Sequence, residues 1–201
     1  MKKLYILLIL IFAGAEILDA QNLPSKKEIM GTMVLANGYF VQKWPDPGKS
    51  IVTNRERPSN IWTRAVYYEG LMALYALNQS KSYYDYAVLW GERHKWGLRD
   101  GIKSRNADNQ CCGQTYLDLY LVDKKPERLK DIQASVDLMM ATDKIDDWTW
   151  IDALQMGMPV YAKLGQLTGD GRYAERMYRM YMDSKVRQGF TDCQSLECLV
   201  Q

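Results

Sequence analysis

The sequence predicts an all-α chain built from repeated helical hairpins. Apolar residues recur at spacings of three and four in seven stretches that follow the first 21 residues, which is the pattern of amphipathic helices. Between these stretches we find no convincing alternation of apolar and polar residues, so no strand is expected. A third observation is a repeat of about 45 residues, which is typical of stacked two-helix units.

Turn residues separate the expected helices. The sequences PDPGKS at 45–50, NQSKS at 78–82, DKKPE at 123–127 and TGDGR at 168–172 combine the Gly, Pro, Asn and Asp residues that end helices and form loops. In chain order, the expected helices cover residues 26–42, 62–79, 82–97, 108–122, 127–141, 151–167 and 171–187.

The repeat is clearest in the leucines of three equivalent helices. Leu74, Leu119 and Leu164 are spaced by 45 residues, and other apolar positions keep the same step. Two helices in each 45-residue unit indicate stacked hairpins, either in an open solenoid or closed into a toroid. The tetratricopeptide period of 34 residues does not fit.

The same register places chemically active residues at the starts of equivalent helices. Subtracting 45 from Asp152 gives Ala107, which is beside Asp108, and subtracting 45 again gives Trp62. The starts of equivalent helices in a hairpin array lie along one rim. We therefore expect two carboxylates and several tryptophans to converge there, facing a central cavity if the array closes.

Asp152 has two interpretations. It follows Trp148 and Trp150 and begins a long apolar helical pattern, and burial against these rings would favour the protonated carboxyl that a general acid needs. Alternatively, an aspartate at the start of a helix caps free N–H groups and interacts favourably with the helix dipole. The register favours the first interpretation without excluding the second.

Composition and charge exclude several functional classes. The 201 residues carry a net charge of +2, and the basic residues form no stripe, so we expect no nucleic-acid partner. The single histidine, His94, excludes a site built from clustered histidines and offers one weak candidate for a Ser-His-Asp triad. The adjacent Cys111 and Cys112 fit no zinc spacing and are expected to be small buried side chains.

The N-terminus has the pattern of a signal peptide. Two lysines precede an apolar run from Leu4 to about Ala15, and a plausible cleavage site follows Ala20. We therefore expect residues 1–20 to be a signal peptide and the protein to be exported, either to the periplasm or as a secreted protein. No later segment has the roughly 20 apolar residues of a membrane span, so no membrane association is expected after cleavage.

Three segments carry a resemblance to a known family. These are WTWIDALQMGMPVYAKLGQLTGDGRY, ADNQCCGQTYLDLY and WTRAVYYEGLMALYALNQSKSYYDYA, and the resemblance extends over residues 26–189. They resemble the unsaturated glucuronyl and unsaturated rhamnogalacturonyl hydrolases of glycosyl hydrolase families 88 and 105. The resemblance implies an (α/α)₆ toroid, which the hairpin register supports independently.

The resemblance also implies a reaction and a site. These enzymes hydrate the 4,5-double bond of an unsaturated uronic acid at the non-reducing end of oligosaccharides released by lyases. An aspartate that matches Asp152 protonates C4 and helps water to add at C5, and the resulting hemiketal opens to release the remaining sugar. No metal or organic cofactor is implied. The matching site residues are the catalytic Asp152 and Asp108, with Trp150, Trp148, Trp62 and Gln114 around the sugar.

The length of the chain departs from this pattern. Six hairpins of 45 residues need about 270 residues, whereas 181 follow the signal peptide, so we expect about half of the toroid in residues 21–189 and a C-terminally truncated family member. Residues 190–201 form an atypical tail. Exposed apolar faces on such a partial ring would favour self-association. The competing hypotheses are a non-catalytic helical-repeat carbohydrate-binding module, a toroid glycosidase that acts on saturated glycans, and an inactive gene fragment.

Overall fold

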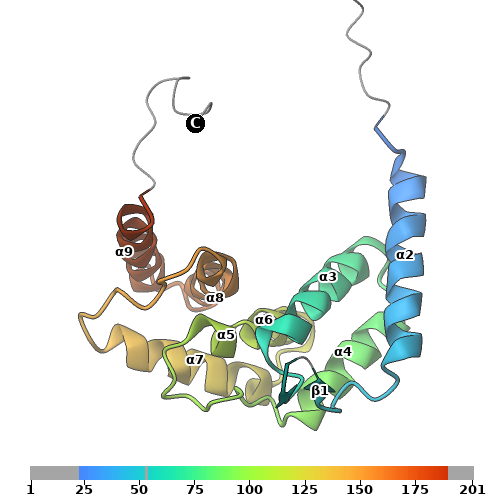
Figure 1. Cartoon of the computed structure of the whole chain (residues 1–201), viewed down its shortest axis with the longest axis horizontal. Coiled ribbons are helices and arrows are strands. Elements are labelled where there is room, and N and C mark those ends of the chain that lie inside the picture. Colours follow the sequence, from blue (N-terminus) through green and yellow to red (C-terminus); the bar gives the residue numbers. More distant parts are fainter. Residues whose placement is uncertain (1–22, 53, 190–201) are drawn as a thin grey trace, which may run out of the picture. The chain divides into compact units, whose positions relative to one another are not determined.

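The computed structural model describes residues 23–52 and 54–189, which divide between two units, Met1–Phe40 and Val41–Gln201 (Figure 1). The first unit contains most of α2 (Lys26–Lys43), a helix with no buried side chain. Ser25 and Glu28 form a capping box at its start, because each side chain accepts a hydrogen bond from the backbone N–H of the other. The expected signal peptide and the C-terminal tail lie outside the described residues.

In the second unit, a two-stranded ribbon, which the sequence does not predict, precedes three helical hairpins. The ribbon pairs Ile51 with Arg57 and Val52 with Glu56. No helix in the described part of the chain is both long and apolar enough to cross a lipid bilayer. The elements are β1 (Ile51–Val52), β2 (Glu56–Arg57), α3 (Trp62–Asn78), α4 (Lys81–Arg93), α5 (Ala107–Gln110), α6 (Cys112–Asp123), α7 (Pro126–Met140), α8 (Asp152–Thr168) and α9 (Arg172–Arg187).

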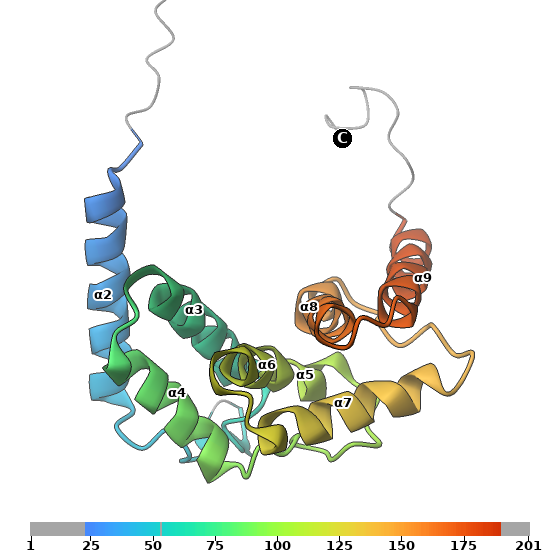
Figure 2. The same ribbon diagram turned by 180° about the vertical axis from the view of Figure 1, so that it is seen from behind.

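The hairpins form two layers of helices. Within each hairpin the two helices pack together, as α3 with α4, α6 with α7 and α8 with α9. Contacts between successive hairpins run mainly through one layer, in which α3 packs on α6 and α6 packs on α8 (Figure 2). The short helix α5 touches α3, α6 and α8. The predicted all-α fold of helical hairpins is confirmed.

The 45-residue register is a property of the backbone as well as of the side chains. Helices α3, α5 and α8 begin at residues 62, 107 and 152, which are spaced by 45. The equivalent leucines Leu74, Leu119 and Leu164 are 2%, 0% and 0% exposed, so they occupy one continuous core. The hydrophobic effect therefore stabilises the same contact in each repeat.

The ends of the inner helices keep the same register. Gln79, Lys124 and Gly169 follow α3, α6 and α8, and all three adopt a left-handed conformation with φ of 51°, 57° and 72°. Each donates its N–H to the carbonyl oxygen four residues earlier. Each inner helix thus ends in the same αL motif, although only the third position has the glycine that best tolerates it.

Two boundaries differ from the predicted ones. The helix expected over 82–97 ends at Arg93, since Lys95 and Trp96 have positive φ and the chain turns back on itself. The Trp96 ring then lies against Gly91, where an added Cβ would come within 2.1 Å of it. The helix expected over 108–122 is divided into α5 and α6 at Cys111.

Replacing Gln79 with glycine is expected to stabilise the second unit by about 0.5 kcal/mol. Glycine relieves the left-handed strain, about 1 kcal/mol, and this gain exceeds the free-energy cost of the entropy that glycine adds to the unfolded chain. Gly169→Ala is the matched control, and it should destabilise the fold by about 1 kcal/mol because alanine meets the strain that Gln79 already bears. Urea unfolding followed by circular dichroism measures both, and a loss of stability in Gln79→Gly would contradict the assigned cap.

Candidate active site

The three residues that the register places on one rim do lie at helix starts. Trp62 is the first residue of α3, Asp108 is the second residue of α5, and Asp152 is the first residue of α8. Helix α5 contacts both α3 and α8. The charge of Asp152 acts on Asp108, which places the two carboxylates within electrostatic reach of one another.

Asp108 is the partly buried member of the carboxylate pair. Asn106 caps α5, and its side chain accepts a hydrogen bond of 2.8 Å from the Asp108 backbone N–H. Burial raises the pKa of the Asp108 carboxyl above its ordinary value, and the negative charges of Asp100 and Asp152 raise it further, whereas positive charges nearby lower it. Because burial is the largest cause, Asp108 retains its proton to higher pH than an exposed aspartate.

Asp152 has a different environment from the one expected. Its side chain is exposed, so the expected burial between tryptophans is wrong for the described structure. The alternative of a helix cap is not supported either. Ile151 occupies the cap position of α8, and no side-chain hydrogen bond caps this helix. The Asp152 carboxylate is therefore free to meet a ligand.

The three tryptophans divide into one core residue and two rim residues. Trp148 is fully buried and lies against Gly157, where an added Cβ would come within 2.7 Å of the ring, and it meets Tyr161 edge-on with centroids 5.7 Å apart. Trp148 is therefore a core residue, which corrects its expected role in substrate binding. Trp150 and Trp62 are partly exposed and remain available at the rim.

Gln114 also has a structural role instead of the expected one. Pro159 lies inside α8 and has no N–H, so the carbonyl oxygen of Gln155, four residues earlier, loses its helical hydrogen bond. Gln114 is a buried residue, 5% exposed. Its side-chain nitrogen donates to this oxygen at 2.8 Å and to the Met156 carbonyl oxygen at 3.2 Å. Gln114 therefore ties α6 to α8, and we do not include it among the sugar-binding residues.

Two arginines near Asp108 escape the sequence analysis. The charges of Arg99 and Arg57 both act on the Asp108 carboxyl and lower its pKa against the larger effect of burial. In each of them the buried Nε has no hydrogen-bond partner. They come from β2 and from the loop after α4, so neither the helical period nor the 45-residue register indicates them.

An ion pair joins the loops that lead to the two aspartates. Arg105, just before the cap of α5, binds both carboxylate oxygens of Asp147 at 2.6 and 2.7 Å. The Asp147 side chain is 3% exposed and lies in the loop that leads to Asp152. Arg105 also donates to the Lys144 carbonyl oxygen in this loop. This bidentate pair holds the starts of α5 and α8 in a fixed relation.

The single histidine serves the core. Its Nε2 lies 2.7 Å from the Ser59 hydroxyl, which in turn donates to the Pro47 carbonyl oxygen at 2.7 Å. Ser59 is fully buried, and burial lowers the pKa of His94. A buried serine whose proton is already donated to a carbonyl oxygen is no nucleophile, so the Ser-His pair is not a hydrolytic site.

The adjacent cysteines are free buried thiols, as expected. Burial raises the pKa of Cys111, and it raises that of Cys112 to about 12, so both remain protonated and unreactive at neutral pH. Within residues 23–52 and 54–189, no group of three or more His, Cys, Asp or Glu side chains is arranged to hold a metal ion. Cys193 and Cys198 lie outside the described residues.

The model of Glycosyl Hydrolase Family 88 matches residues 32–189. This chain belongs to that family. The match includes Trp62, Asp108 and Asp152 and all three hairpins, so the predicted recognition is confirmed. A comparison with curated protein sequences gives no match.

Solved structures of similar fold include a member of this family. A family 88 glycosyl hydrolase from Bacteroides vulgatus is 26% identical, with a TM-score of 0.69 over 81% of this chain and 48% of its own. A chain described as a polysaccharide lyase is also 26% identical, with a TM-score of 0.70 over 81% of this chain and 47% of its own. The present chain therefore matches about half the length of each of these two solved relatives.

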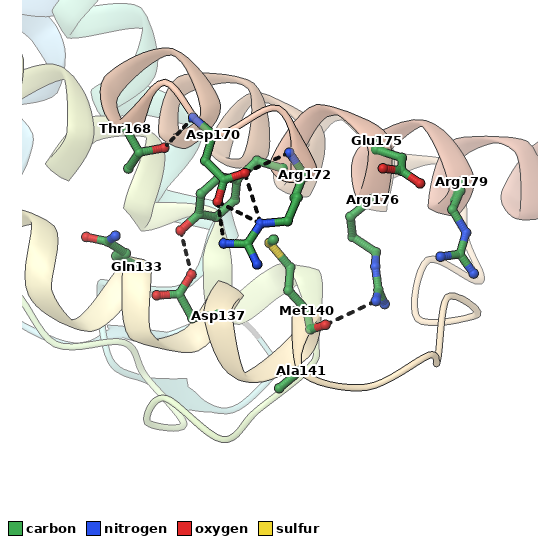
Figure 3. Close-up of a pocket in the computed structure, with 11 residues that line it drawn as sticks. Gln133, Asp137, Met140, Ala141, Thr168, Asp170, Arg172, Glu175, Arg176 and Arg179 are labelled. Carbon is green, nitrogen blue, oxygen red and sulfur yellow. Dashed lines mark hydrogen bonds and ion pairs between the residues drawn. The ribbon is translucent and has the colours of Figure 1, made fainter.

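A cavity of about 650 Å³ lies away from the rim of this family 88 chain, between α7 and α9 (Figure 3). Its wall includes Thr168, at the opposite end of α8 from Asp152. Most of its polar groups bond one another. Arg172 pairs with Asp170, and Tyr173 donates to Asp137. The cavity contains none of the predicted site residues. Its Arg172–Asp170 pair stabilises the turn before α9, and Tyr173 and Arg176 join α9 to α7.

Removing Arg105 is expected to destabilise the rim. Arg105→Met removes both short hydrogen bonds to the buried Asp147 carboxylate and leaves only Lys144, 4.0 Å away, as its cation, which should cost about 2 kcal/mol of unfolding free energy. The control is Lys81→Met, since Lys81 pairs with Asp85 four residues away on an exposed helix face, and its loss should change the unfolding free energy far less. Equal effects in urea unfolding would contradict a structural ion pair between the two loops.

Proposed function

We propose that this family 88 chain carries the site of an unsaturated uronyl hydrolase, which hydrates the 4,5-double bond of an unsaturated uronic acid on a lyase-derived oligosaccharide. The observation that carries the proposal is the convergence of Asp108 and Asp152 at the starts of two equivalent helices. Membership of a glycoside hydrolase family supports a carbohydrate substrate. The segment around Asp152 supports the unsaturated one, through its resemblance to enzymes of this type.

The reaction needs one proton donor and one proton acceptor. The C4=C5 bond of the substrate is a vinyl ether, so a proton adds at C4 and the oxygen of a water molecule adds at C5. The attacking water loses one proton to a carboxylate and becomes the C5 hydroxyl of a hemiketal. The hemiketal opens by breaking its bond to the ring oxygen, which leaves a ketone at C5 and a hemiacetal at C1, and the hemiacetal then collapses to an aldehyde and releases the remaining sugar. A pair of carboxyl groups in unlike environments can supply both roles.

The two aspartates of the rim have unlike environments. We assign proton transfer at the reacting carbons to Asp152, whose exposed carboxylate a ligand can reach. A sugar ring bound against Trp62 and Trp150 would bring its reacting carbons to the Asp152 carboxyl and exclude water from the site. Asp108 is the second, partly buried carboxyl group of the pair, and we assign it a hydrogen bond with the bound sugar.

A non-catalytic carbohydrate-binding module is the second candidate. The exposure of Asp152 favours it, because the free chain does not itself supply the desolvation that a proton donor needs. In that case Trp62 and Trp150 bind the sugar rings and the chain shows no turnover. A third candidate is a glycosidase that acts on saturated glycans. Activity on saturated substrates alone would favour it.

Localisation and self-association stay predictions. The pattern of residues 1–20 supports export to the periplasm or secretion. Tyr178 and Val186 on the last hairpin, 61% and 74% exposed, are apolar surface through which copies of the chain would associate. We therefore propose an exported protein that self-associates through α9.

Loss of ultraviolet absorption by the substrate double bond tests the proposed reaction. With an unsaturated disaccharide as substrate, Asp152→Asn should lower kcat by about 100-fold or more, since general acid–base catalysis contributes that much. Asp143→Asn changes an exposed aspartate in the preceding loop and should keep full activity. Equal rates in Asp152→Asn and the unchanged chain would exclude Asp152 as the acid, and no turnover in either would favour the binding module.

A further inference from the structure

A third carboxylate lies beside the aspartate pair. Glu69 is on α3, two helical turns from Trp62, and its side chain is partly buried. One carboxylate oxygen accepts a hydrogen bond from the Cys111 thiol at 3.1 Å. The other accepts one from the Gln155 side-chain nitrogen at 2.6 Å. Glu69 therefore joins the three successive hairpins at one point.

The partners of Glu69 place it relative to the aspartates. Cys111 follows Asp108 by three residues and Gln155 follows Asp152 by three residues, and the backbone is helical over both intervals. Residues three apart share one face of a helix, with a rise of about 4.5 Å between them. The Glu69 carboxylate therefore lies about one helical turn below both aspartates, on the side where α3 faces α5 and α8.

Glu69 has acceptor capacity that the fold does not use. A carboxylate offers about four acceptor positions, and the two recorded hydrogen bonds use two of them. The nearby cation Lys163 pairs with Asp118 at 2.6 Å. Burial raises the pKa of Glu69, against the hydrogen bonds from Cys111 and Gln155 and the charge of Lys163, while the charge of Asp118 adds to the rise.

We propose that Glu69, together with Gln155, binds the hydroxyl groups of the sugar ring whose double bond lies at Asp108 and Asp152. This inference rests on the proposed function. A 4,5-unsaturated uronate keeps hydroxyl groups on C2 and C3, next to the double bond. Glu69 accepts a hydrogen bond from one of them, and the exposed Gln155 amide, which can both donate and accept, contacts the other. Glu69 and Gln155 then determine which ring faces the aspartates.

Substrates that lack one hydroxyl test this role on the full chain. The measurement is kcat and KM for an unsaturated disaccharide and for analogues without the C2 or the C3 hydroxyl of the unsaturated ring. Glu69→Gln should raise KM for the parent disaccharide about tenfold, because a charged hydrogen bond is weakened, with little change in kcat. For the analogue that lacks the bound hydroxyl, the same substitution should change kcat/KM less than twofold.

Two further variants keep the inference testable. Gln155→Ala removes the second contact while keeping the Glu69 carboxylate, and its effect on kcat/KM should disappear for the analogue that lacks the other hydroxyl. Glu92→Gln, an exposed glutamate on α4, should change nothing. An equal loss on all three substrates would overturn the inference alone, since it would reveal a purely structural role for Glu69. An unchanged chain without turnover would overturn the proposed function and this inference with it.

Discussion

The 45-residue spacing of the inner helices is the constraint on which the candidate site depends. It sets where α3, α5 and α8 begin, and the same interval separates the left-handed residues that end α3, α6 and α8. Burial of one leucine in each repeat fixes this spacing, and the Gln114 amide joins α6 to α8 where Pro159 has removed a helical hydrogen bond. The buried leucines and the Gln114 hydrogen bond therefore position the residues at the starts of these helices.

Environment, more than position, separates the two aspartates of this family 88 chain. Both begin equivalent helices, yet Asp108 is partly buried and has a raised pKa, whereas Asp152 is exposed. The Arg105–Asp147 pair holds their loops together, and Glu69 lies one turn below both. The candidate site is thus a set of carboxyl groups of graded burial, which fits the proposed proton transfer and the proposed recognition of a polar ring.

The sequence predicts the helices and the rim well because both follow from periodic apolar burial. It fails where the direction of a single side chain decides the outcome. Trp148 and Trp150 are two residues apart, and only the structure shows that Gly157 admits the Trp148 ring into the core. The contact between Glu69 and Gln155 spans 86 residues, about two repeats, and no local pattern indicates a hydrogen bond at that distance.

Nuclear magnetic resonance titration of the Asp108 carboxyl carbon tests most directly whether the register brings the two aspartates together. We expect a pKa above the ordinary aspartate value in the unchanged chain, and a lower one in Asp152→Asn, because that variant removes a neighbouring negative charge. Asp143→Asn should leave the titration unchanged. A pKa for Asp108 at or below the ordinary value, with no response to Asp152→Asn, would contradict the paired site.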